Sequence, residues 1–222
     1  MAVSKVKEKR MDSNFWLQKW RNQDIGFHEG QSNPLLVEYF QQLQLPAGSR
    51  VLVPLCGKTR DIAWLLANGY RVAGVELAQM AIDQLFDELG MAPRITPRGE
   101  LLHYRAANID IFVGNIFDVS AKVLGEVDGI YDRAALVALP EPMRNRYTAH
   151  LMALTNQAPQ LLLCLEYDQS QMNGPPFSID AAEVARHYGA CFVTTLLTSQ
   201  TLADPLKGKC PAKENAWLLQ KS

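Results

Sequence analysis

The sequence predicts a doubly wound α/β domain built on a largely parallel central sheet. Residues 51–53 form a short, uninterrupted apolar run, which is typical of a strand that is buried on both faces. From there to residue 219, strand-like and helix-like stretches alternate at the pitch of successive βαβ units. A chain of 222 residues fits one such domain, and its 48% hydrophobic content is enough for a substantial core.

Two helices are expected before the first strand. Trp16 and Trp20 are four positions apart, so a short helix places both on one face. Asn33 is a typical helix N-cap, and Pro34 fits the first turn of the helix that follows it. An apolar stripe through residues 35–43 then predicts the buried face of this second helix.

The remaining elements follow in order along the chain. The first of the two helices described above is expected at residues 14–20. Further helices are expected at residues 61–67, 80–89, 143–156 and 180–188. Strands are expected at residues 51–53, 71–75, 101–105, 110–113, 129–131, 161–167, 191–197 and 216–219. The segment around Pro93, Pro97 and Gly99 is predicted to be irregular. The two strands that flank residues 106–108 are expected to pair with each other.

The charge balance excludes partners that bind by general electrostatic attraction. Lys and Arg number 22 against 23 for Asp and Glu, so we expect no nucleic-acid partner and no membrane partner. The four cysteines show no C-x-x-C spacing, which predicts reduced thiols and a cytoplasmic location. Residues 1–10 are basic, but no apolar stretch follows them, so they are not a signal peptide. We expect residues 1–12 to form a flexible tail, residues 13–222 a single domain, and the chain to be a monomer.

The turn after the first strand is where an open α/β sheet binds its ligand. Residues 57–59 read Gly-Lys-Thr and imitate the end of a phosphate-binding loop, but Leu52 stands where that motif needs its first glycine. The same turn keeps only the middle glycine of the dinucleotide-binding motif, which leaves little room for a pyrophosphate. A nucleoside triphosphatase and an NAD-dependent dehydrogenase are therefore both disfavoured.

Glu76 follows the second predicted strand, nineteen residues after Gly57. At this position a carboxylate can accept hydrogen bonds from both hydroxyls of a ribose. The alternative is an ordinary solvated carboxylate at a strand end, and the spacing alone leaves the two interpretations equally open. A nucleoside cofactor without a pyrophosphate reconciles Glu76 with the glycine-poor turn. S-adenosylmethionine is such a cofactor.

Several short blocks of sequence are informative as an ordered set. They are Phe-Trp-Leu-Gln-Lys-Trp at 15–20, Ile-Gly-Phe-His-Glu at 25–29, Val-Pro-Leu-Cys-Gly-Lys at 53–58, Gly-Val-Glu at 74–76, Asp-Arg-Ala-Ala-Leu at 132–136 and Gly-Pro-Pro-Phe at 174–177. Together the blocks resemble the thiopurine S-methyltransferase family, particularly its bacterial members. The resemblance implies the seven-stranded class I methyltransferase fold with an N-terminal helical cover. It also implies S-adenosylmethionine as methyl donor and S-adenosylhomocysteine as product.

The resemblance further implies a set of binding residues. The cofactor would contact Trp20, Leu55, Glu76, Asn115, Ile116 and Arg133, and Phe27 would border the acceptor. Trp20 would form an apolar wall near the sulfonium, and backbone at Leu55 would approach the cofactor. Asn115 and Ile116 would flank the adenine. The loop at residues 174–177 would cover the site.

Each of these residues also has a purely structural explanation. Trp20 could be the core anchor of its helix, and Leu55 could be ordinary packing. Residues 115–116 could form only a turn after a strand. Arg133 could make a surface ion pair with Asp132, its neighbour in the sequence.

The expected methyl transfer depends mainly on how the protein aligns the two reactants. Holding an acceptor sulfur in line with a methyl sulfonium exploits an effective molarity of order 10⁵ M, roughly 7 kcal/mol. An aromatic thiol ionises partly near neutral pH, so no general base is assigned; Arg133 could favour the thiolate electrostatically or hold the cofactor. No histidine stands at metal-ligand spacing from another ligand, so no metal is expected. The predicted function is in-line S-methylation of a small aromatic or heterocyclic thiol of the thiopurine type.

Two other functions stay open at this point. One is a methyltransferase for another small nucleophile, such as a selenium or tellurium compound or an oxygen or nitrogen acceptor. The other is a module that binds S-adenosylmethionine without turnover. The acceptor is uncertain because residues 205–211 carry Lys207 and Lys209 where the family has an arginine-bearing segment. A lysine lacks the planar fork of arginine, so the sequence leaves open whether either lysine replaces it.

Overall fold

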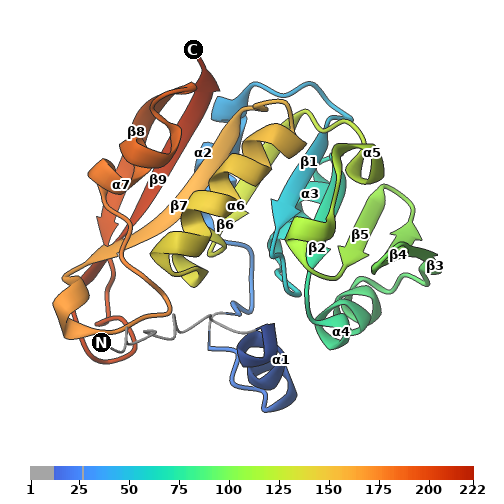
Figure 1. Cartoon of the computed structure of the whole chain (residues 1–222), viewed down its shortest axis with the longest axis horizontal. Coiled ribbons are helices and arrows are strands. Elements are labelled where there is room, and N and C mark those ends of the chain that lie inside the picture. Colours follow the sequence, from blue (N-terminus) through green and yellow to red (C-terminus); the bar gives the residue numbers. More distant parts are fainter. Residues whose placement is uncertain (1–12, 27) are drawn as a thin grey trace, which may run out of the picture.

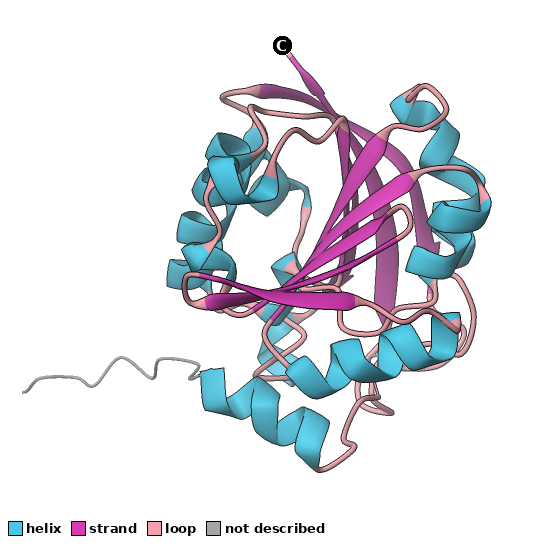
Figure 2. Ribbon diagram, turned by 90° about the vertical axis from the view of Figure 1, so that its right-hand side faces the viewer, coloured by secondary structure: helices cyan, strands magenta, loops and turns pink. Residues whose placement is uncertain are grey.

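A computed structural model describes residues 13–26 and 28–222. The tail predicted at residues 1–12 and the predicted acceptor residue Phe27 lie outside the described residues. One twisted sheet has its strands in the order β3-β4-β5-β2-β1-β6-β7-β9-β8. Helices pack on both faces of this sheet (Figure 1, Figure 2). This arrangement confirms the predicted α/β class.

The elements occur in the predicted order. The strands are β1 Arg50–Pro54, β2 Arg71–Glu76, β3 Arg94–Arg98, β4 Leu101–Ala106, β5 Ile109–Val113, β6 Gly129–Arg133, β7 Gln160–Tyr167, β8 Phe192–Thr201 and β9 Ala212–Lys221. The α-helices are α1 Ser13–Arg21, α2 Pro34–Tyr39, α3 Asp61–Ala67, α4 Gln79–Leu89, α5 Ala121–Leu124, α6 Glu141–Leu154 and α7 Ala181–Tyr188. Short 3₁₀ helices are η1 Phe40–Leu43, η2 Ile116–Asp118, η3 Leu136–Ala138 and η4 Gln169–Gln171. The predicted helices and strands are all present, and the sequence did not predict α5 or β3.

Strands β5, β2, β1, β6 and β7 form the parallel centre of the sheet. In β1, Val51 and Val53 belong to the core beneath α2, α3 and α4. Leu52 belongs to the core on the opposite face, which includes residues of α5, α6 and α7. Side chains alternate along a strand, so this division confirms that the apolar run is a strand buried on both faces.

The sheet has nine strands, where seven were expected, and it is mixed because both flanks are antiparallel. The hairpin of β3 and β4 adds the two extra strands beside β5. Pro97 is tolerated in β3 because β3 lies at the edge, where one side of the backbone needs no partner. The prediction of an irregular segment around Pro93, Pro97 and Gly99 was therefore wrong. The antiparallel pairing of β4 with β5 confirms the expected pairing across residues 106–108.

Helix α1 lies outside the two helical layers, below the sheet in Figure 1. Its Trp20 is only 3% exposed and packs in a small cluster with Ala78 and Ala81 at the start of α4. The next helix, α2, begins where predicted, because Asn33 Oδ1 accepts a hydrogen bond of 2.9 Å from the Leu35 N–H. Helix α1 is the N-terminal helical cover that the sequence led us to expect.

Candidate functional site

A crevice of about 1340 Å³ opens at the carboxyl ends of the parallel strands. The turns that follow β1, β2, β5 and β6 line one side, and α1 lines the other. The loop at residues 174–176, together with Leu202, Leu206 and Lys207, completes the wall. Open α/β sheets bind their ligands at this edge, so the crevice is the candidate site.

The turn between β1 and α3 has a tightly bent backbone. Leu55 and Gly57 have positive φ angles of 47° and 51°. A Cβ atom at Gly57 would lie 3.0 Å from Cζ2 of Trp20, so the turn and the approach of the indole both favour glycine. Trp20 anchors α1 in a core cluster and also lines the crevice. Leu55 likewise packs against the main core and lines the crevice. Both residues therefore belong to the core and to the crevice wall.

Glu76 is buried at the end of β2, with 6% of its surface exposed. Its Oε2 accepts a hydrogen bond of 2.8 Å from the Gly57 N–H, and its Oε1 accepts one of 2.8 Å from the Ala78 N–H. Burial raises the pKa of Glu76, and the backbone donors act against that rise. The interpretation of Glu76 as a solvated carboxylate is therefore wrong. Glu76 is an oriented acceptor in the crevice wall, and a carboxylate offers more acceptor positions than these donors fill.

Arg133 ends β6 and lines the crevice. Its Nε donates to Asp61 Oδ2 at 2.9 Å, its Nη1 to Glu29 Oε1 at 3.0 Å, and its Nη2 to Thr59 Oγ1 at 3.3 Å. Burial acts to lower the pKa of Arg133, but the neighbouring carboxylates, Asp61 foremost, outweigh it and raise the pKa. The alternative of an ion pair with Asp132 is wrong, because adjacent residues of a strand point to opposite faces.

Asp132 is buried on the other face of the sheet. Its Oδ2 accepts a hydrogen bond of 2.7 Å from the Tyr147 hydroxyl, and its Oδ1 accepts one of 3.4 Å from the Leu136 N–H. Burial raises the pKa of Asp132 to about 6, and these two donors counter part of the rise. Asp132 is therefore a structural group behind the crevice, not a partner of the cation inside it.

The network around Arg133 contains carboxylates that sequence reasoning missed as site residues. Asp61 is fully buried, and its two oxygens accept from the Asn33 N–H at 2.8 Å and the Tyr131 hydroxyl at 3.0 Å. Glu214 of β9 accepts from Asn33 Nδ2 at 3.2 Å, and burial and then the charge of Glu29 raise its pKa. In the sequence, Asp61 resembles any acidic residue at a helix start, and Glu214 lies in a polar stretch. No local signal could have found either.

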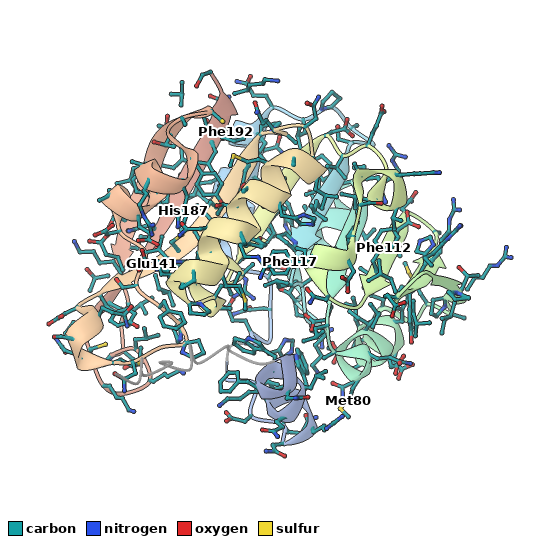
Figure 3. All side chains as sticks on the ribbon, viewed as in Figure 1. Met80, Phe112, Phe117, Glu141, His187 and Phe192 are labelled. Carbon is teal, nitrogen blue, oxygen red and sulfur yellow. The ribbon has the colours of Figure 1, made fainter. Side chains whose placement is uncertain are left out.

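The segment after β5 makes the turn that the structural explanation predicted. Asn115 Oδ1 accepts a hydrogen bond of 3.1 Å from the Phe117 N–H and so begins η2. Ile116 is only 5% exposed, and both Asn115 and Ile116 line the crevice. Phe117, the middle residue of η2, is labelled in Figure 3, and the guanidinium carbon of Arg146 on α6 lies 4.5 Å from its ring centroid. The turn thus presents a polar and an apolar side chain together.

Two loops from later in the chain meet over the crevice. Lys207 Nζ donates a hydrogen bond of 2.7 Å to the Pro175 carbonyl and so links them. Burial lowers the pKa of Lys207, and the charge of Lys19 adds to that effect. Of the two lysines in this segment, Lys207 lines the crevice, whereas Lys209 is exposed and is not among the lining residues. Of these two lysines, Lys207 alone could contact a molecule bound in the crevice.

The structure also bears on metal binding, on membrane spans and on the state of the cysteines. Across residues 13–26 and 28–222, His, Cys, Asp and Glu side chains form no group arranged to hold a metal ion. No helix in the same residues is long and apolar enough to cross a bilayer. Cys56, Cys164, Cys191 and Cys210 are free thiols. Cys56 lies in the crevice wall, where burial raises its pKa well above the ordinary value and keeps the thiol protonated.

Comparison with known proteins identifies the family. A family model described as thiopurine S-methyltransferase matches residues 11–222. The chain is 50% identical over 213 residues to the thiopurine S-methyltransferase of Xanthobacter autotrophicus, covering 96% of this chain and 100% of that protein. This chain belongs to the thiopurine S-methyltransferase family. It is also 49% identical over 203 residues to the Gluconobacter oxydans member, covering 91% of this chain and 92% of that protein.

Solved structures agree on the fold. The 1,6-didemethyltoxoflavin-N1-methyltransferase of Burkholderia thailandensis, with bound 1,6-didemethyltoxoflavin and S-adenosylhomocysteine, has a TM-score of 0.64 at 18% identity, covering 94% of this chain and 87% of that chain. The magnesium protoporphyrin IX methyltransferase of Synechocystis, with bound S-adenosylhomocysteine, has a TM-score of 0.61 at 11% identity, covering 94% and 100%. The fold is that of class I methyltransferases. With its family, the chain is an S-adenosylmethionine-dependent methyltransferase that releases S-adenosylhomocysteine.

Proposed function

We propose that the crevice binds S-adenosylmethionine with Glu76 accepting hydrogen bonds from the ribose hydroxyls. The observation that carries this proposal is a buried, backbone-oriented carboxylate with acceptor capacity to spare at the end of the second parallel strand. The cofactor has a ribose diol and no phosphate, which suits a turn with a single glycine. When bound, it supplies an electrophilic methyl group on a sulfonium.

The other proposed cofactor contacts line the same crevice as Glu76. They are Trp20, Leu55, Asn115, Ile116 and Arg133, all of which line the crevice. Trp20 supplies an aromatic wall, and Asn115 and Ile116 supply one polar and one apolar contact for the adenine. The guanidinium of Arg133 suits the carboxylate of the amino-acid part of the cofactor.

Arg133 can be assigned to positioning more readily than to stabilising a thiolate. Its single positive charge faces both Asp61 and Glu29, so the local charge around it is negative overall. A carboxylate that replaces Glu29 at the guanidinium keeps this charge balance and matches its planar donors, whereas a single thiolate sulfur does not match them. Glu29 is 45% exposed in its side chain, so it can move aside and leave one face of the guanidinium for a ligand.

The proposed acceptor is the sulfur of a small aromatic or heterocyclic thiol of the thiopurine type, methylated by in-line displacement. Phe15, Trp16 and Pro175 line the crevice and provide flat apolar surface for a planar ring. Phe27 is still proposed to border this acceptor. An aromatic thiol needs no dedicated base, so the residues of the chain align the reactants and exclude water.

The proposal includes the setting in which the reaction takes place. We propose that residues 13–222 form one domain and that the chain acts as a monomer in the cytoplasm. The four free thiols support a reducing compartment. The partner is a small-molecule thiol, with no nucleic-acid or membrane partner, and the near-neutral charge supports this.

A methylation assay with labelled S-adenosylmethionine and 6-mercaptopurine tests the proposal directly. We expect label on the sulfur of the thiopurine. Parallel reactions with a phenol, an amine and selenite test the other acceptor classes. If one of these three compounds is labelled and the thiol is not, the acceptor belongs to the class of the labelled compound. If neither the thiol nor any of the three is labelled, the proposed reaction is contradicted.

A further inference from the structure

We propose that Arg144 is a positioning residue for the acceptor: it fixes Phe177, and through Phe177 the loop at 174–176 that lines the crevice. This inference rests on the proposed methyl transfer to a small thiol and names a determinant outside the crevice. Arg144 lies in the first turn of α6 and is not among the residues that line the crevice. Any effect it has on the acceptor must therefore pass through another residue.

The guanidinium of Arg144 is held in a fixed orientation. Arg144 is only 6% exposed. Its Nη1 donates a hydrogen bond of 2.8 Å to the Leu139 carbonyl, and its Nε donates one of 2.8 Å to Glu183 Oε1 on α7. Leu139 itself lines the crevice. Because the guanidinium is planar, two bonds in different directions fix the plane as well as the charge.

Phe177 connects this guanidinium to the cover of the crevice. The Arg144 guanidinium carbon lies 5.6 Å from the centroid of the Phe177 ring, within the range of a cation–π contact. Gly174 approaches the same ring so closely that a Cβ atom there would lie 2.6 Å from Phe177 Cδ1. The Phe177 N–H donates a hydrogen bond of 2.6 Å to the carbonyl of Val137, another lining residue. The place of the ring therefore sets the place of Gly174 and the prolines that follow it.

Burying a charge to hold one ring is costly, so packing alone does not explain Arg144. An apolar side chain could fill the same volume without desolvating a cation. Glu183 does not depend on Arg144 for a partner, because its Oε1 also accepts from Arg186 Nη2 at 2.8 Å and lies 3.1 Å from His187 Nε2. His187, like Glu183, is a residue of α7, and it is labelled in Figure 3. What Arg144 supplies and Arg186 does not is the contact with Phe177, together with the hydrogen bond to the Leu139 carbonyl.

The test compares Arg144→Met with Arg186→Met. Both substitutions remove an arginine from the same Glu183, but Arg186 is on the exposed side of α7, where its guanidinium contacts Asn145, Glu141 and Glu183. We expect Arg144→Met to lower kcat/KM for 6-mercaptopurine by roughly 10- to 100-fold, mainly through the KM of the acceptor. The dissociation constant for S-adenosylmethionine, measured by calorimetry, should stay close to wild type. Arg186→Met should match wild type in both measurements.

Two further variants keep the test decisive if Arg144→Met folds poorly. Phe177→Leu should reproduce the acceptor defect, and adding Arg144→Met to it should lower kcat/KM little further, because both act through one contact. Arg144→Lys keeps the charge without the plane and should recover part of the loss. An unchanged acceptor KM in Arg144→Met, or an equal rise in Arg186→Met, would overturn the proposal.

Hydrogen exchange separates this inference from the proposed function. The peptide that spans residues 170–180 should exchange faster in Arg144→Met than in wild type or Arg186→Met. If wild type fails to methylate the thiol, the proposed function is wrong, and the exchange data still decide whether Arg144 holds the loop. Equal exchange in all three proteins would contradict the positioning role.

Discussion

The two sides of the crevice are built on different principles. On the side proposed for the cofactor, Glu76 is fixed by backbone N–H groups of turns that continue the parallel strands directly. On the side proposed for the acceptor, loops from distant parts of the chain are held by side chains, Lys207 on Pro175 and Arg144 on Phe177. Backbone geometry set by a sheet tolerates few changes, whereas side-chain contacts can be exchanged singly. Substitutions on the first side should therefore have the larger effects.

Arg133→Ala should give the largest change. It leaves the buried carboxylate of Asp61 without its cation, which costs about 4 kcal/mol of unfolding free energy, and it weakens both cofactor binding and acceptor turnover. Urea unfolding and calorimetry with S-adenosylmethionine measure the two effects. Adding Asp61→Asn should recover part of the stability but not the affinity. Undiminished cofactor affinity in Arg133→Ala would remove Arg133 from the proposed site.

Glu76→Ala should act mainly on the cofactor. Two hydrogen bonds from hydroxyls to a carboxylate are worth about 3 kcal/mol together, so the dissociation constant for S-adenosylmethionine should rise roughly 100-fold. Calorimetry measures this constant directly. Glu38→Ala, on the exposed surface of α2, is the matched control and should bind like wild type. Wild-type affinity in Glu76→Ala would contradict the ribose role.

The titration of Asp132, on strand β6 behind the cofactor side, predicts how the stability of the fold depends on pH. Its folded pKa, about 6, is above its ordinary value of 3.8, so the folded chain holds the proton more tightly and stability falls as pH rises from about 4 to 6. The difference corresponds to no more than about 3 kcal/mol. In urea unfolding, Asp132→Asn should gain stability relative to wild type between pH 4 and pH 7. A difference between the two proteins that stays constant with pH would show that Asp132 does not titrate in this range.

Lys207→Met should have the smallest effect. The hydrogen bond from Lys207 to the Pro175 carbonyl lies at the surface, where such contacts contribute about 1 kcal/mol or less. The KM for 6-mercaptopurine should rise a few-fold with unchanged cofactor affinity. Lys209→Met is the matched control two positions away and should have no effect. Equal effects of the two substitutions would mean that net charge, and not the bridge between the loops, is what matters.

Sequence reasoning succeeded where a few neighbouring residues carry the signal. The apolar run at 51–53 gave β1, and Asn33 followed by Pro34 gave the start of α2. The spacing of Glu76 from Gly57 pointed to the end of the second strand, where the two residues are joined by a hydrogen bond. Such signals depend on backbone propensity and periodicity, which the local sequence encodes.

The parts that could not be predicted depend on residues that are distant in the chain. Asp61, Arg133 and Glu214 become neighbours only through the order of the strands. The contact of Arg144 with the Phe177 ring likewise has no signature in either local sequence. Strand β3 was missed because Pro97 argues against a strand unless the place of that strand at the sheet edge is known. Topology, and not local composition, decides each of these cases.

Strand β9 has a consequence for how the chain reaches its working form on the ribosome. It is antiparallel to both β7 and β8 and lies between them, so β8 has no neighbour in the sheet until residues 212–221 have been made. The same strand supplies Glu214 to the crevice, whose other lining residues start at Phe15. Synthesis runs from the N-terminus, and a nascent chain that stops short of β9 has an incomplete sheet. Completion of the crevice therefore requires residues 212–221, which are made after every other strand of the sheet.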